Sequence, residues 1–166
     1  MPSPKPILIA EDSEDDVVFL KHAFKHLGIV NPVYIVHDGD ETIAYLKGEG
    51  QFADREKYPL PYVLFVDLKM PRRNGFEVLA WLKGQQQFND MLTVVLTVRT
   101  EMQDVTRAYA LGADSFLVKP CLPDEIENLA NYYRDYWVFA PVRRKKPLPG
   151  TPPGRTSKFL RSLVLF

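Results

Sequence analysis

The sequence has one cysteine and no long apolar stretch, and these two shortages exclude several kinds of protein. Because Cys121 is the single cysteine among 166 residues, no disulfide bond can form within the chain. The apolar run at residues 7–10 is too short for the core of a signal peptide, and no run reaches the length of a membrane-spanning helix. A Gly-rich loop ending in Lys followed by Ser or Thr is also missing, so the sequence offers no P-loop nucleotide site. We therefore expect a cytoplasmic protein without a membrane span.

Acidic residues are missing from residues 142–166, which contain seven Lys or Arg residues. Because the whole chain has 21 residues of each sign, residues 1–141 carry 14 basic and 21 acidic side chains and a net charge of −7. The basic stretch is also rich in proline, a composition that is typical of linkers and tails. We expect one packed domain over residues 5–136 and a flexible, Pro-rich basic tail over residues 137–166.

The basic cluster at residues 143–146 allows two interpretations. It can be a solvated charge run or a contact with the acidic domain, and either needs no ligand. Clusters of this kind can also bind nucleic acid or an anionic membrane surface. The residues after Tyr136 are too few for a helix-turn-helix domain, so we expect no DNA-binding domain.

Short apolar runs alternate five times with stretches that have helical periodicity. Such an alternation predicts an α/β protein with a parallel sheet and helices on both faces, a doubly wound arrangement. The predicted strands are residues 7–10, 33–36, 62–67, 92–97 and 115–118. The predicted helices cover about residues 14–27, 40–47, 75–87, 104–112 and 123–136.

Polar side chains stand where four of these strands end. Glu11 and Asp12 follow the first strand, Asp67 ends the third, Thr97 ends the fourth and Lys119 follows the fifth. The carboxyl ends of parallel strands meet at one edge of a sheet, which is where such folds bind ligands. We therefore expect these side chains to lie together. A set of surface ion pairs is the alternative, but it leaves their convergence unexplained.

The residue types at this edge suit one kind of chemistry. Three clustered carboxylates need a cation at neutral pH, and an all-oxygen ligand set favours Mg²⁺ or Mn²⁺. A lysine and a hydroxyl beside a metal can hold the oxygens of a phosphoryl group. A carboxylate next to that metal can act as a nucleophile and form an aspartyl-phosphate.

The combined motifs resemble the receiver domain of two-component response regulators. They are Glu-Asp, then Asp with Met-Pro behind it, then Asn-Gly, Thr and Lys-Pro, and they extend over about residues 5–136. The resemblance implies a flavodoxin-like (βα)5 fold with strand order 2-1-3-4-5. It also implies a signalling module that catalyses only its own phosphorylation and dephosphorylation, with a sensor histidine kinase or a histidine phosphotransfer protein as donor.

The resemblance assigns roles to particular residues. It implies that Asp67 accepts the phosphoryl group and that Lys119 and Thr97 each contact a phosphoryl oxygen. It gives Thr97 and Phe116 the role of a switch. The implied ligands of Mg²⁺, which Mn²⁺ can replace, are Glu11, Asp12, Asp67 and the backbone carbonyl of Lys69. The peptide bond from Lys119 to Pro120 is usually cis in this family.

The insertion at residues 48–61 resembles that of single-domain regulators that partner phytochrome-type histidine kinases. Such regulators often dimerise, so we expect a homodimer and an output through protein–protein association. Two alternatives stay open. One is a receiver that serves as a scaffold without signalling. The other is an aspartyl-phosphate phosphatase or phosphotransferase, but such enzymes place a second Asp two residues after the nucleophile, where this chain has Lys69.

Three residues depart from what the family usually has near the phosphoryl group. Val98 follows Thr97 where a small residue is usual, and Lys69 and Arg99 stand at positions that influence dephosphorylation in the family. A branched side chain beside the site restricts the approach of water. We therefore predict a slowly hydrolysed phosphoryl group. His22 and His26, four residues apart, could bind a metal, although an exposed helix face explains them without one.

Overall fold

The structure, a computed structural model, describes residues 4–98 and 103–141. Within these residues five strands form one parallel sheet in the order β2-β1-β3-β4-β5. Their bounds are β1 Ile7–Ala10, β2 Val33–Val36, β3 Val63–Asp67, β4 Leu92–Thr97 and β5 Ser115–Val118. The sheet confirms the predicted flavodoxin-like (βα)5 fold and its strand order.

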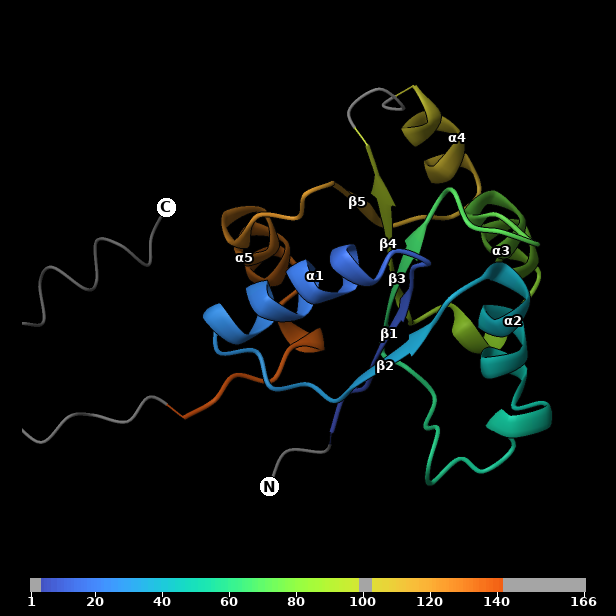
Figure 1. Cartoon of the computed structure of the whole chain (residues 1–166), viewed down its shortest axis with the longest axis horizontal. Coiled ribbons are helices and arrows are strands. Elements are labelled where there is room, and N and C mark those ends of the chain that lie inside the picture. Colours follow the sequence, from blue (N-terminus) through green and yellow to red (C-terminus); the bar gives the residue numbers. More distant parts are fainter. Residues whose placement is uncertain (1–3, 99–102, 142–166) are drawn as a thin grey trace, which may run out of the picture.

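The helices of the described residues cover both faces of the sheet. They are α1 Glu14–His26, α2 Gly39–Lys47, α3 Gly75–Lys83, α4 Asp104–Ala110 and α5 Pro123–Tyr132, with short 3-10 turns η1 Gly50–Phe52, η2 Gln86–Phe88 and η4 Arg134–Tyr136. Helices α1 and α5 lie on one side of the sheet, and α2, α3 and α4 lie on the other (Figure 1). No helix in the described part of the chain has the length and apolar character needed to cross a membrane.

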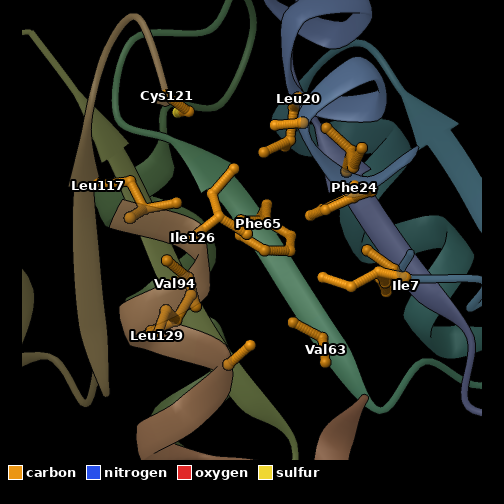
Figure 2. Close-up of a cluster of buried hydrophobic side chains, with 14 of the residues drawn as sticks. Ile7, Leu20, Phe24, Val63, Phe65, Val94, Leu117, Cys121, Ile126 and Leu129 are labelled. Atoms are coloured by element: carbon orange, nitrogen blue, oxygen red, sulfur yellow. The ribbon is translucent and has the colours of Figure 1, made fainter. Parts of the chain in front are cut away.

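Strand β3 lies at the centre of the sheet and is buried along its whole length. Its side chains alternate between two apolar clusters, since successive residues of a strand point to opposite faces. Phe65 points to the α1 and α5 side, where Leu20, Phe24 and Ile126 pack around it (Figure 2). Leu64 belongs to the cluster under α2, α3 and α4. Because each buried side chain of this size contributes about 1.5–3 kcal/mol, the strand that leads to Asp67 is firmly anchored.

Side-chain caps begin the three helices that follow β1, β2 and β3. Ser13, Asp38 and Asn74 each accept a hydrogen bond from a backbone N–H in the first turn of α1, α2 and α3 respectively. Each cap comes soon after a strand end. The first turns of these helices are therefore held beside the sheet edge at which the polar residues of interest stand.

Two helices end earlier than the apolar pattern predicts. Helix α3 ends at Lys83 rather than near residue 87, and α5 ends at Tyr132 rather than near residue 136. After α5 the chain leaves the helical conformation at Tyr133, whose φ is −108° and ψ is 59°. This turn brings Trp137 into the core, where it is 5% exposed. Long-range packing therefore ends α5.

The packed fold continues to Ala140, which corrects the predicted domain boundary at residue 136 and the predicted flexibility of the segment just after it. Phe139 forms an antiparallel bridge with Ile29, and the N–H of Ala140 donates to the carbonyl of Gly28 at 2.7 Å. The proposed tail at residues 142–166, with its basic cluster, lies outside the described residues.

The buried side chain of Asn31 fixes the segment after α5. Its Nδ2 donates to the carbonyl oxygens of Lys5 at 2.7 Å and Tyr136 at 2.9 Å. Its Oδ1 accepts from the N–H of Val138 at 2.7 Å. Asn31 therefore satisfies three backbone groups that come from both ends of the described chain.

The insertion at residues 48–61 packs onto the end of α2. The Arg55 guanidinium donates to the carbonyl oxygens of Tyr45 at 2.7 Å and Leu46 at 2.8 Å, two of the acceptors that a helix end leaves unpaired. Phe52 is buried, with its ring centroid 5.1 Å from that of Tyr45. The loop thus contributes aromatic side chains to the apolar cluster under α2, α3 and α4.

Candidate functional site

Three carboxylates meet at the carboxyl edge of the two central strands. Glu11 directly follows β1 and Asp67 is the last residue of β3, the neighbouring strand. One carboxylate oxygen from each of Glu11, Asp12 and Asp67 lies within 4.8 Å of the others. Glu11 and Asp67 are buried and Asp12 is exposed, so the cluster faces solvent on the Asp12 side.

Lys119 brings an ammonium group into the same cluster. Its Nζ lies 2.8 Å from Asp67 Oδ2 and 2.5 Å from Glu11 Oε2, and its side chain is 12% exposed. Its backbone N–H donates to the carbonyl of Thr97 at 2.7 Å, which ties it to the end of β4. The bond from Lys119 to Pro120 is cis, as predicted.

A fourth carboxylate, that of Asp16, also contacts Lys119. Asp16 Oδ2 lies 3.0 Å from the ammonium nitrogen. The strand-end pattern does not include Asp16, because this residue comes from the first turn of α1. One signal in the sequence could have indicated it, since Asp16 belongs to the acidic first turn of the helix that directly follows Glu11 and Asp12.

Burial and charge shift the protonation of this cluster. Burial raises the pKa of Glu11 to about 8, an effect that the hydrogen bond from Lys119 opposes and the nearby charge of Asp67 reinforces. Burial acts to lower the pKa of Lys119, but its hydrogen bonds to Asp67, Glu11 and Asp16 outweigh burial and hold that pKa above its ordinary value. Lys119 is therefore charged at neutral pH and compensates part of the negative charge around it.

The donor set fits a hard divalent cation. All three clustered groups offer carboxylate oxygens, which Mg²⁺ and Mn²⁺ prefer over nitrogen or sulfur. Lys119 supplies one positive charge against Asp12, Asp16 and Asp67, and a dication would offset the remaining charge and favour the ionised form of Glu11. Burial of Glu11 without full charge compensation is costly, and a bound cation relieves that cost.

The chain beyond β3 folds tightly against Asp67. The N–H of Lys69 donates to Asp67 Oδ1 at 3.1 Å, and the N–H of Gly75 donates to the carbonyl of Leu68 at 3.0 Å. A Cβ on Gly75 would lie 2.4 Å from the backbone oxygen of Asp67, a distance that only glycine permits. This close approach places Lys69 beside the carboxylate cluster. Its carbonyl as a metal ligand stays a prediction.

A cavity of about 520 Å³ opens beside the cluster, between the loop after β3 and helix α4. Asp12 and Lys69 line its near side, and Asp104 and Arg107 line its far side. The Arg107 guanidinium lies over the ring of Phe76, 4.2 Å from the centroid, so the far side is held by a cation–π contact between α4 and α3.

The two predicted switch residues, Thr97 and Phe116, differ in burial and in their position along the strands. Thr97 is buried at the end of β4, and its hydroxyl donates to the carbonyl of Val98 at 3.4 Å. Phe116 lies further down β5, half-buried, with its ring edge-on to Tyr109 of α4 at 6.2 Å between centroids. The structure thus brings Glu11, Asp12, Asp67 and Lys119 together, and it leaves Phe116 at the border between β5 and α4.

The family model described as the response regulator receiver domain matches residues 7–131. The chain belongs to this family. It is 29% identical over 135 residues to the response regulator Rcp1 of Synechocystis sp., which covers 81% of this chain and 90% of that protein. It is also 29% identical over 135 residues to a probable methanogenesis regulatory protein, FilR2, of Methanothrix harundinacea, covering 80% and 83% of the two chains.

Solved structures of phytochrome-associated regulators have the same fold. The bacteriophytochrome response regulator AtBRR matches with a TM-score of 0.73 and 31% identity over 84% of this chain and 99% of that chain. The Mn²⁺-bound form of Rcp1 matches with a TM-score of 0.69 and 28% identity over 82% of this chain and 99% of that chain. The chain is therefore a receiver-domain response regulator with a phosphoacceptor role in signalling, and its homologues include single-domain phytochrome-associated regulators.

Proposed function

We propose that Asp67 is the phosphoacceptor of this receiver and that a divalent cation binds beside it. The position of Asp67 carries the proposal, because it ends the central strand inside a carboxylate cluster, 2.8 Å from the Lys119 ammonium. The cation, Mg²⁺ or Mn²⁺, is held by Glu11, Asp12, Asp67 and the backbone carbonyl of Lys69. The Mn²⁺-bound structure of the relative Rcp1 supports a metal at such a site.

The phosphoryl donor is the phosphohistidine of a sensor histidine kinase or a histidine phosphotransfer protein, a phytochrome-type kinase by analogy with the relatives. An oxygen of Asp67 forms a bond to phosphorus while the bond from phosphorus to the imidazole nitrogen breaks, and that nitrogen keeps the electron pair. Lys119 and the Thr97 hydroxyl each donate to a phosphoryl oxygen. When bound, the cation offsets the negative charge that gathers on these oxygens.

The output of phosphorylation is a change at the edge between β5 and α4. Thr97 moves toward the phosphoryl group, and the Phe116 ring, which packs against Tyr109 of α4, turns inward. The altered surface changes how the protein associates with a target or with a second copy of the chain. We expect the protein to form a homodimer and to act in the cytoplasm. The module catalyses only its own phosphorylation and dephosphorylation.

The test uses acetyl phosphate as donor with Mg²⁺, intact mass spectrometry and size-exclusion chromatography. Wild-type protein gains the mass of one phosphoryl group, and so does a control with the exposed Asp124 of α5 replaced by Asn. Asp67→Asn gains none, and EDTA abolishes the gain in the wild type and in the Asp124→Asn control. An unchanged wild-type mass contradicts the proposal. A phosphorylation-dependent shift in elution volume would identify association as the output.

A further inference from the structure

Asp16 is held at the first turn of α1 by the cap of that helix. Its N–H donates to Ser13 Oγ at 3.3 Å, and the N–H of Ser13 donates to Glu11 Oε1 at 3.0 Å. Ser13 thus links the backbone of Asp16 to the end of β1. The Asp16 side chain is 32% exposed and lies at the solvent side of Lys119.

Lys119 has three carboxylate partners, and two of them are shared with the cation site. Glu11 and Asp67 contact the ammonium and also belong to the oxygen cluster that can hold a cation. Asp16 contacts the ammonium at 3.0 Å but is not part of the oxygen cluster found among the described residues. Asp16 is therefore the one partner of Lys119, among these three, for which a cation does not compete.

We propose that Asp16 is a positioning residue that holds the Lys119 ammonium in place while Glu11 and Asp67 bind a divalent cation. This inference rests on the proposed function of the site. Lysine has a long and flexible side chain, and a largely buried ammonium needs a partner of opposite charge. Without Asp16, Lys119 has only the carboxylates that the cation requires, so the ammonium and the cation compete for them.

The first test compares two substitutions in the same turn of α1. Asp16→Asn removes the charge that contacts Lys119, and Asp15→Asn removes the charge of an exposed neighbour as a matched control. Isothermal titration with Mg²⁺ measures the dissociation constant at low and high NaCl concentration. We expect Asp16→Asn to weaken Mg²⁺ binding about tenfold, at the low end of the loss that removal of an outer-shell residue of a metal site causes. Asp15→Asn changes it less than about twofold, and added salt removes that smaller effect.

The second test asks whether Asp16 acts through Lys119. In a Lys119→Met background, Asp16→Asn no longer weakens Mg²⁺ binding, because the competing ammonium is gone. Asp16→Glu, which retains the charge, restores much of the wild-type affinity. Thermal unfolding in EDTA checks that each variant folds, and Asp16→Ser replaces Asp16→Asn if the latter does not.

Two outcomes overturn the inference while leaving the proposed function intact. One is an equal effect of Asp16→Asn and Asp15→Asn on Mg²⁺ affinity. The other is an undiminished effect of Asp16→Asn in the Lys119→Met background, which indicates a general charge effect. Failure of the wild-type protein to bind Mg²⁺ or to accept a phosphoryl group overturns the proposed function itself, and the inference with it.

Discussion

The indole ring of Trp137 lies 6.2 Å from the ring of Phe65, which stands two residues before Asp67 on β3. Phe24 of α1 completes the group, with its ring 5.5 Å from Phe65 and 6.4 Å from Trp137. The segment after α5 therefore packs directly behind the strand that carries the candidate phosphoacceptor. We therefore expect the position of this strand to depend on residues that follow α5.

Replacing Trp137 with Ala should lower the free energy of unfolding by ~3–5 kcal/mol, because it empties a large volume in the core. Urea denaturation followed by far-UV circular dichroism measures the change. Tyr132→Ala is the control, since that aromatic side chain is 80% exposed and should cost little. Equal costs for the two substitutions would mean that the segment after α5 does not contribute to the packed domain.

Replacing Asn31 with Ala should cost about 1–3 kcal/mol, because it leaves partly buried backbone groups of Lys5, Tyr136 and Val138 without their partner. Amide hydrogen exchange should show a faster rate at Val138 than in wild type. Asn131→Ala, at an exposed position of α5, serves as control. An unchanged exchange rate at Val138 would contradict the role assigned to Asn31.

Lys119→Met should destabilise the metal-free protein, because it leaves the buried carboxylates of Glu11 and Asp67 without their cation. The expected loss is about 2–4 kcal/mol in EDTA, and saturating Mg²⁺ should recover more stability in this variant than in wild type. Thermal unfolding with and without Mg²⁺ measures both effects. The exposed Lys21 of α1, changed to Met, should behave as wild type. A smaller Mg²⁺ effect in Lys119→Met than in wild type would argue that the lysine and the cation do not share partners.

The aspartyl-phosphate should persist well beyond minutes, and Val98→Ala should shorten its lifetime several-fold. Val98 directly follows Thr97 and is 38% exposed, so its branched side chain stands where water approaches the end of β4. Arg99, the second residue expected to affect hydrolysis, lies outside the described residues. Decay of the phosphorylated mass after removal of the donor gives the lifetime, with Val30→Ala as a distant control. Loss of the wild-type phosphoryl group within seconds would refute the prediction.

Asp114 should make the protein less stable as the pH rises. Asp114 is exposed as a residue, but partial burial around its carboxylate raises its pKa above the ordinary 3.8, and the hydrogen bond from the N–H of Thr93 opposes this shift. The folded state therefore holds this proton more tightly than the unfolded state. The resulting cost is absent below about pH 3.8, grows as the pH passes toward the raised pKa, and is constant above it.

Asp114→Asn keeps an oxygen that can accept from Thr93 but removes the charge. We measure its free energy of unfolding by urea denaturation from acid to neutral pH. Relative to wild type, this free energy should increase as the pH rises. Asp124→Asn, at an exposed position, should run parallel to wild type. If wild type instead became more stable relative to Asp114→Asn as the pH rises, the predicted effect of the Asp114 charge would be wrong.

The strands and the central carboxylates could be predicted from the sequence because local patterns determine them. A buried strand such as Val63–Asp67 can be recognised from its continuous apolar run. A carboxylate at the end of such a strand is not explained by packing, and it therefore indicates a functional site. The end of α5 could not be predicted, because the burial of Trp137 and the bonds of Asn31 decide it across more than 100 residues. Asp16 was missed because it lies in the first turn of α1 and not at a strand end, where the other carboxylate partners of Lys119 stand.

The hydrogen bonds of β3 limit how the protein can respond to a phosphoryl group. β3 pairs with β1 on one side and β4 on the other, up to the register of Asp67 with Leu96. A shift of its backbone would break hydrogen bonds to both neighbouring strands, so we expect β3 to keep its position when Asp67 is phosphorylated. Structural changes caused by the phosphoryl group therefore have to occur in the side chains and loops that follow the strand ends, rather than in the backbone of β3.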